Sequence, residues 1–189
     1  RQVKSTLIGL KNAKTKYCIK IRSDCIISNN NFIKYFEKFK KKSKEYNILE
    51  KRILISSNFT IDPNKIDLPF HFSDWFYFGL KKDLLKIFNQ NYRKKENDSI
   101  ADWYKTNKKP LKYHSNYFCK FRIEQNIIKN FLKKYINFSF KNAYDNSEKN
   151  IILTEKILSN NFIIFDPPEL GLISFKNKLF NENEEILYF

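Results

Sequence analysis

The sequence contains no methionine, only three glycines and only five prolines among its 189 residues. So little glycine and proline excludes collagen-like chains and the glycine- and proline-rich disordered classes. The three cysteines (Cys18, Cys25 and Cys119) are odd in number and widely spaced, which excludes a disulfide framework and a CxxC metal clip. No apolar run approaches the roughly 18 residues that a membrane-spanning helix needs. These absences leave a globular protein as the expected class.

Acidic residues are also scarce. The sequence has 20 Asp and Glu but 36 Lys and Arg, which gives a formal net charge of +16. Such an excess often indicates a nucleic-acid partner. Only five of the basic residues are Arg, however, and Arg is the side chain whose bidentate fork suits bases and phosphates. We therefore expect a solvated basic surface and no specific nucleic acid. The basic run at 38–44 leaves peripheral contact with an anionic membrane surface as an alternative.

The hydrophobic content of 42% is enough for one compact domain, and we expect residues 1–189 to form a single α/β domain. Apolar residues recur at helical spacing over about residues 1–13, 32–39, 80–88, 123–135 and 153–160. Alternating or continuous apolar runs predict strands over 17–24, 52–57, 69–80, 161–165 and 170–175. Because helices and strands alternate through the first half, the pattern predicts a layered α/β fold with a mostly parallel central sheet flanked by helices.

Asp24 is the first candidate site residue, because it ends a strand expected at the centre of the sheet. Open α/β sheets bind ligands at the carboxyl ends of their strands, and a carboxylate there can hold a divalent cation that neutralises a diphosphate. Arg22 shares the face of Asp24 and either pairs with it or contacts a phosphate. The simpler interpretation is a strand-end carboxylate that caps the next turn.

A second cluster consists of His71, Ser73 and Asp74 in an otherwise apolar segment. Strand alternation would place His71 and Ser73 on one face and Asp74 on the other. Burying a carboxylate between Phe72 and Trp75 is costly without a partner, so the cluster indicates either a site or a satisfied buried network.

Glu124 opens the predicted helix over 123–135 and borders its apolar face. An acid in the first turn suits the helix dipole, and the alternative is a general base held in a cleft. The sequence has no Gly-rich phosphate loop, no GxSxG and no HExxH, so nucleotide hydrolysis of the Walker type, serine hydrolysis and zinc proteolysis lack their usual motifs.

Several of these segments resemble the WavE lipopolysaccharide-synthesis family. The matching pieces are residues 1–24, 53–60, 69–88, the Glu124-Gln125 helix and 169–176. The resemblance implies a glycosyltransferase with a GT-A-like fold for nucleotide-diphospho-sugars, whose first strands would precede Arg1 and are absent here. The chain begins with Arg and has no Met, which agrees with a segment of a longer protein.

The resemblance also implies residue roles. Arg22-Ser23-Asp24 would be the variant of the DXD motif that binds the nucleotide-sugar, with Asp24 holding Mn²⁺ or Mg²⁺ as the sole carboxylate of the motif. Glu124 or Asp74 would be the catalytic base. His71, Ser73 and Trp75 would contact the acceptor, where aromatic rings stack on sugar faces.

The expected activity is therefore metal-assisted transfer of a sugar from a nucleotide-diphospho-sugar donor to a growing lipopolysaccharide or capsule glycan, with a glycan or lipid-linked glycan as the acceptor. The expected location is cytoplasmic, with the inner face of the cytoplasmic membrane as an alternative. The alternative function is a non-catalytic basic module that binds anionic lipid or polysaccharide, in a manner that falls steeply with salt and ignores divalent metal.

Overall fold

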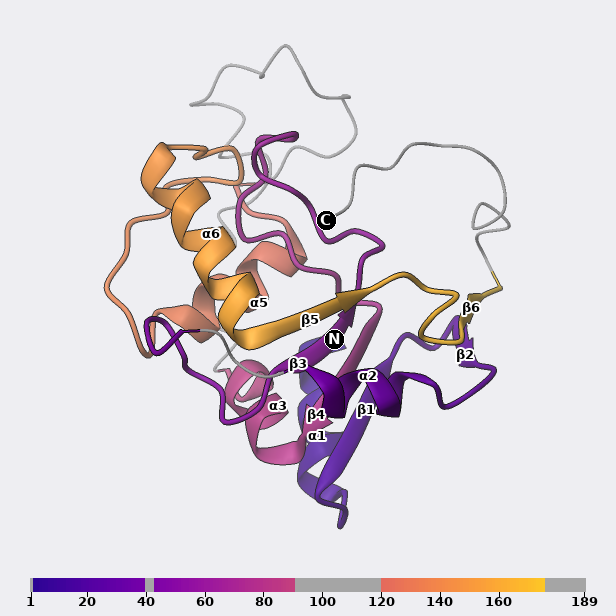
Figure 1. Cartoon of the computed structure of the whole chain (residues 1–189). Helices are drawn as coiled ribbons and strands as arrows, with labels where there is room; N and C mark the ends of the chain where they lie inside the picture. The colour runs from indigo at the N-terminus through magenta and orange to yellow at the C-terminus, as the bar shows by residue number, and fades with distance from the viewer. Residues whose placement is uncertain (1, 40–42, 91–119, 176–189) are drawn as a thin grey trace.

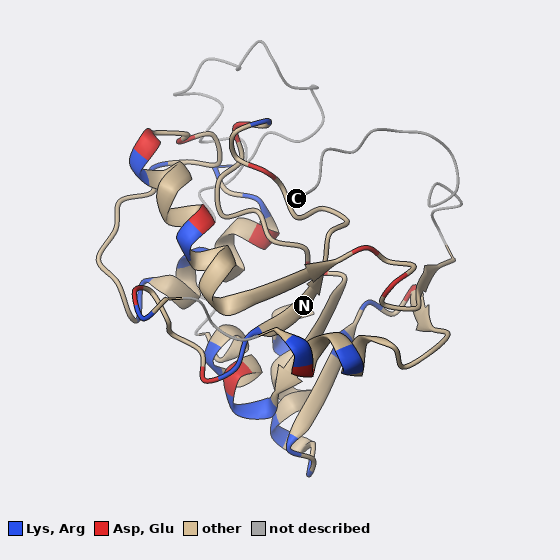
Figure 2. Cartoon of the chain, in the orientation of Figure 1, with Lys and Arg blue, Asp and Glu red and all other residues tan. Residues whose placement is uncertain are grey.

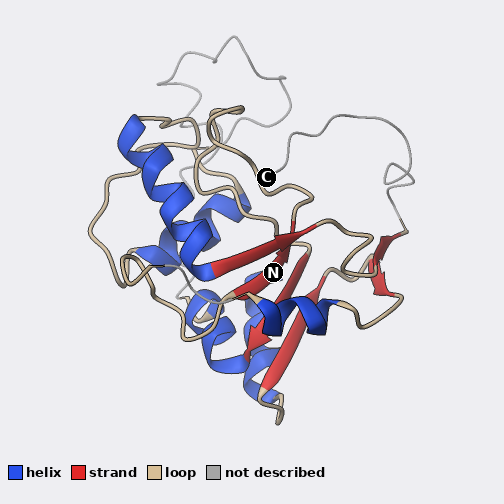
Figure 3. Ribbon diagram, in the orientation of Figure 1, coloured by secondary structure: helices blue, strands red, loops and turns tan. Residues whose placement is uncertain are grey.

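The structure is a computed structural model that describes residues 2–39, 43–90 and 120–175 (Figure 1). Helices and strands are interspersed along the described chain, which confirms the α/β class (Figure 3). In order the elements are α1 (Gln2–Asn12), β1 (Tyr17–Ile21), β2 (Cys25–Ile27), α2 (Phe32–Lys38), β3 (Ile53–Ser56), β4 (Phe76–Leu80), α3 (Lys81–Phe88), α5 (Ile123–Leu132), α6 (Glu148–Asn161), β5 (Phe162–Phe165) and β6 (Leu172–Ser174).

Four strands form the main sheet in the order β1-β4-β3-β5. Strand β4 runs antiparallel to both β1 and β3, and only the β3–β5 pair is parallel. The prediction of a mostly parallel sheet is therefore wrong for the described sheet, which is mixed. The reason is the connection from β3 to β4, which contains no crossover helix of the kind that parallel neighbours need, so β4 returns in the opposite direction.

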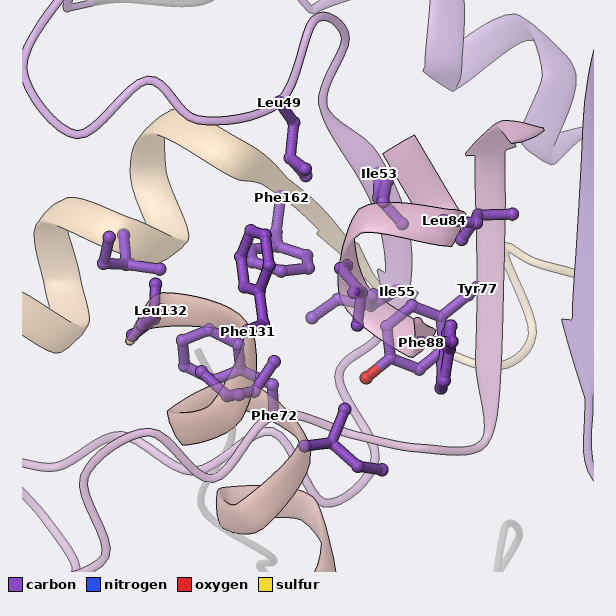
Figure 4. Close-up of a cluster of buried hydrophobic side chains, with 14 of the residues drawn as sticks. Leu49, Ile53, Ile55, Phe72, Tyr77, Leu84, Phe88, Phe131, Leu132 and Phe162 are labelled. Carbon is purple, nitrogen blue, oxygen red and sulfur yellow. The ribbon is translucent and has the colours of Figure 1, made fainter. Parts of the chain in front are cut away.

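Apolar side chains cover both faces of this sheet, which explains why its strands are apolar without strict alternation. Ile53 and Ile55 of β3 face a large core built with α1, α3, α5 and α6 (Figure 4). Leu54, between them, faces a second core with Phe32 and Phe36 of α2. Tyr77 and Phe88 meet edge to face in the large core, with ring centroids 5.2 Å apart.

The strand predicted over 69–80 is shorter than expected, because β4 begins only at Phe76. The preceding residues are buried, yet they form a loop whose hydrogen bonds go to other segments. The hydroxyl of Thr60 accepts from the backbone NH of Ser73 (3.1 Å), and the NH of Ile61 donates to the carbonyl of His71 (2.9 Å). The alternation assumed for His71, Ser73 and Asp74 therefore does not apply.

A small second sheet pairs β2 with β6, and β2 is an element that the sequence pattern did not predict. With only three residues, it offers too short a pattern to recognise.

Basic residues are spread over α1, α2, α3 and α6 in the part of the chain that is described (Figure 2). The basic run at 38–44 does not continue a helix, because α2 ends at Lys38, and residues 40–42 lie outside the described ranges. No helix among the described residues is both long enough and apolar enough to cross a membrane.

Candidate functional site

Three segments meet at the end of the main sheet where β1 and β3 finish and β4 begins. Because β1 and β4 are antiparallel neighbours, the residue after β1 lies beside the residue before β4, and the backbone NH of Arg22 donates to the carbonyl of Trp75 (3.2 Å). The first turn of α5 approaches the same loop and brings Glu124 to His71. The structure thus brings Arg22 against Trp75 and His71 against Glu124, which lie far apart in the sequence.

Arg22 and Asp24 form a bidentate ion pair. The guanidinium Nε and Nη2 of Arg22 each lie 2.9 Å from one carboxylate oxygen of Asp24, and the side chain of Asp24 is only 12% exposed. The Arg22 guanidinium also lies 4.9 Å from the ring centroid of Trp75. The hydrogen bond to Asp24 is the main cause that raises the pKa of Arg22. Ser23, between them, is exposed in the turn to β2.

This arrangement does not fit a preformed metal site at Asp24. Both of its carboxylate oxygens accept from Arg22, and no group of three His, Cys, Asp or Glu side chains converges among the described residues. A divalent cation would have to displace the Arg22 guanidinium before Asp24 could become a ligand. The role of Asp24 in holding Mn²⁺ or Mg²⁺ stays a prediction.

His71 and Glu124 form the second feature of the site. The Nε2 atom of His71 lies 3.6 Å from Oε2 of Glu124, and its Nδ1 lies 2.9 Å from the carbonyl oxygen of Phe59. Burial, the largest effect, lowers the pKa of His71, which favours the neutral imidazole. A carbonyl only accepts, so Nδ1 carries the hydrogen and Nε2 presents its lone pair to Glu124.

The carboxylate of Glu124 is the accessible acid of this pair, because its side chain is 23% exposed whereas that of His71 is 8% exposed. A proton taken up by Glu124 can be donated in turn to Nε2 of His71. The two side chains are therefore arranged to accept one proton from a group that approaches Glu124.

Backbone strain accompanies this part of the site. Phe59 has a φ of +65° and Phe70 a φ of +59°, a left-handed conformation that bulky residues rarely adopt. Phe59 supplies the carbonyl that orients His71, and its ring stacks on Trp75 at 5.5 Å. Strain of this kind persists where the surrounding contacts over-determine the backbone, as they do here.

Gln125 explains why Glu124 lies where it does. Its side-chain amide is fully buried and donates to the carbonyls of Pro69 (2.8 Å) and Ala143 (2.9 Å). Its Oε1 accepts from the backbone NH of Arg122 (3.0 Å) at the start of α5. Gln125 thereby fastens the first turn of α5 to the segment that carries His71.

Lys20 and Asp74 lie between these two pairs. The ammonium of Lys20 donates to the backbone carbonyl of Asp74, and the Asp74 carboxylate accepts from the amide of Gln2 in α1. The other oxygen of Asp74 is buried without a hydrogen-bond partner among the described residues. Burial, opposed by the charge of Asp74, lowers the pKa of Lys20 to about 8. Lys20 lies within the strand predicted over 17–24 and was not among the candidate site residues.

The residues predicted to contact an acceptor are all buried. Ser73 is fully enclosed, and His71 and Trp75 are nearly so. Phe76 and Tyr77 lie in the two cores and pack there. Burial favours a positioning role for this segment, and direct contact between it and an acceptor stays a prediction.

The fold and the site define a mixed α/β protein in which an imidazole, three carboxylates and two cations gather at one end of the sheet. The sequence matches the family described as WavE lipopolysaccharide synthesis over residues 1–187, and the chain belongs to this family. This confirms the resemblance and gives the protein a role in lipopolysaccharide synthesis, with glycan-related substrates. Neither the curated proteins nor the solved structures contain a match to the chain.

Proposed function

We propose that the protein is a glycosyltransferase that adds a sugar from a nucleotide-diphospho-sugar to a hydroxyl group of a growing lipopolysaccharide glycan. The observation that carries the proposal is the pairing of Glu124 with a buried His71 at the end of the sheet that also holds Lys20 and Arg22. Membership of a lipopolysaccharide-synthesis family supplies the class of substrate. Such a reaction needs a base for the acceptor hydroxyl and positive charge for the departing diphosphate.

In the proposed reaction the acceptor oxygen forms a bond to the anomeric carbon of the donor sugar. The bond from that carbon to the diphosphate oxygen breaks, and the nucleoside diphosphate leaves with the electron pair. Glu124 takes the proton of the acceptor hydroxyl and donates a hydrogen bond to Nε2 of His71. Glu124 is a better candidate for this base than Asp74, since Asp74 is 3% exposed and already accepts from Gln2.

Positive charge for the leaving group would come from Lys20 and Arg22, which lie on one face at the end of β1. Their attraction to a diphosphate acts in a partly desolvated site, where charge stabilisation is stronger than in water. No step of this proposal passes through a metal, because Arg22 occupies both oxygens of Asp24.

Glu124→Gln tests the assignment of the base. We expect the rate of transfer to fall by roughly 10²- to 10⁴-fold, because the amide cannot take up the proton, while the unfolding midpoint stays unchanged. The measurement is release of nucleoside diphosphate from a panel of nucleotide-sugars in the presence of extracted lipopolysaccharide. Glu148→Gln, an exposed acid in the first turn of α6, is the matched control and should retain full activity.

Two outcomes would contradict the proposal. Full activity of Glu124→Gln together with an inactive Asp74→Asn would assign the base to Asp74. Absence of donor turnover, together with polysaccharide or lipid binding that salt abolishes, would favour a non-catalytic basic module. Protection of the fold by a nucleotide-sugar against heat separates the two functions before an acceptor is known.

A further inference from the structure

Arg52 is buried in a way that the fold does not explain. It precedes β3 at the end of the sheet opposite the candidate site, and it is 8% exposed. Its Nε and Nη2 atoms are enclosed and have no hydrogen-bond partner among the described residues. Burial lowers the pKa of Arg52, and no carboxylate in the described part of the chain offsets that effect. An uncompensated guanidinium destabilises a fold, so its presence points to a partner that arrives from outside.

A cavity of about 480 Å³ adjoins this side chain. Its lining residues come mainly from β5, the edge strand of the main sheet, and from the second half of α6. Its walls are mainly apolar, with Leu158, Ile163 and Phe165 lining them and Phe39 at the rim. A volume of this size suits a small molecule.

The cavity has few polar lining residues, and its two charged ones carry opposite charges. Apart from Arg52, the lining includes Ser159, which is exposed, and Glu155. Glu155 is held by the amide of Asn64 at 2.6 Å, so its carboxylate remains at the rim as a fixed negative charge. That charge disfavours ligands with several anionic groups, and Arg52 is the one cation among the described lining residues.

We propose that this cavity binds an amphipathic anion, which carries a single phosphate or carboxylate head on an apolar body. The head would pair with the guanidinium of Arg52, whose planar donors match both anions. The apolar body would lie against Phe165 and Ile163 and remove apolar surface from water. The site is independent of the proposed transfer reaction, since Arg52 precedes β3 whereas Phe59 and His71 follow it.

Octyl phosphate is the probe, with inorganic phosphate and octanol as its two halves. We expect calorimetric titration to show binding of octyl phosphate that is at least tenfold tighter than that of either half. Arg52→Met should weaken this binding at least tenfold and, without ligand, raise the unfolding midpoint, because it removes an unpaired buried charge. Lys65→Met removes an equal charge from an exposed lysine that pairs with Asp62, and this variant should bind octyl phosphate as the wild type does.

Ser159→Trp provides a second test, since it keeps Arg52 and fills the cavity with an indole ring. It should abolish octyl phosphate binding without lowering the unfolding midpoint. Equal binding by the wild type and Arg52→Met would overturn the proposal, as would binding of inorganic phosphate that matches octyl phosphate. A lower unfolding midpoint of ligand-free Arg52→Met would also overturn it, because Arg52 would then stabilise the free protein.

Discussion

The ionisation of Lys20 responds to its surroundings in this site. It lies opposite Tyr77 in the β1–β4 pair, and its ammonium is 5.7 Å from the centroid of the Tyr77 ring. Burial lowers its pKa to about 8, from 10.5 for a solvated lysine. A lysine with this pKa changes charge in a range where proteins are routinely studied, which gives it a measurable signature.

Lys20→Met should change the pH dependence of stability. Between pH 8 and 10.5 the unfolded chain binds the Lys20 proton and the folded chain does not, so the free energy of unfolding of the wild type rises with pH in this window. The rise due to Lys20 is about 3 kcal/mol, and the variant lacks it. Urea unfolding of both proteins at pH 7.5 and 10.5 measures the difference, and parallel pH profiles would contradict the buried ammonium.

Arg22 donates a hydrogen bond to each carboxylate oxygen of Asp24. Arg22→Gln removes both hydrogen bonds to the Asp24 carboxylate, so we expect Mn²⁺ to bind the variant more tightly than the wild type, by roughly tenfold. Calorimetric titration with MnCl₂ measures the affinity. The double variant Arg22→Gln/Asp24→Asn should bind Mn²⁺ no more tightly than the wild type. Tight Mn²⁺ binding by the wild type that EDTA reverses, with transfer lost in parallel, would instead assign the metal role to Asp24.

At the scale of elements, α5 depends on Gln125 for its docking. Gln125→Leu leaves the carbonyls of Pro69 and Ala143 without their donor, and each buried unsatisfied group costs about 1–3 kcal/mol. We expect the free energy of unfolding to fall by roughly 3 kcal/mol, as measured by urea unfolding. Ile123→Ala, an exposed position on the same helix, should change it by less than about 0.5 kcal/mol. An equal loss in both variants would show that Gln125 has no special role.

Helices with a clear apolar stripe were predicted from sequence with nearly correct bounds. The stripe over 1–13 corresponds to α1, and the stripe over 123–135 contains α5, which ends three residues earlier. These predictions succeed because helical hydrogen bonds are local and one face is buried. The strand prediction is wrong for residues 69–75, because this segment is buried without being a strand. A continuous apolar run does not distinguish a buried strand from an enclosed loop.

The direction of the sheet and part of the site depend on contacts that no local pattern contains. The antiparallel course of β4 follows from the loop before it, and a loop has no periodicity from which to predict a direction. Asp24, His71 and Glu124 could be recognised as candidates from the sequence, because each is a polar residue within or next to an apolar segment. Lys20 and Phe59 did not, since Lys20 belongs to an ordinary alternating strand and Phe59 acts through its backbone.

The whole molecule carries a net charge of +16 that is spread over several helices (Figure 2). Self-repulsion of this charge destabilises the folded state, and salt screens it. We expect the unfolding midpoint to rise by about 3 °C, or about 1 kcal/mol, when NaCl is raised from about 0.02 M to about 0.3 M. Differential scanning calorimetry with NaCl and with KCl measures the shift. A midpoint that falls with added salt would mean that favourable ion pairs outweigh the repulsion.

The pairing of the strands has a consequence for the order in which the protein is made. Ile53 of β3 pairs with Phe162 of β5, and Cys25 of β2 pairs with Ser174 of β6. Neither sheet is complete until residues 162–174 have left the ribosome, so β3 and β2 lack these strand partners while more than one hundred intervening residues are made. A chaperone that shields aromatic segments during translation would therefore increase the yield of folded protein more than one that acts after release.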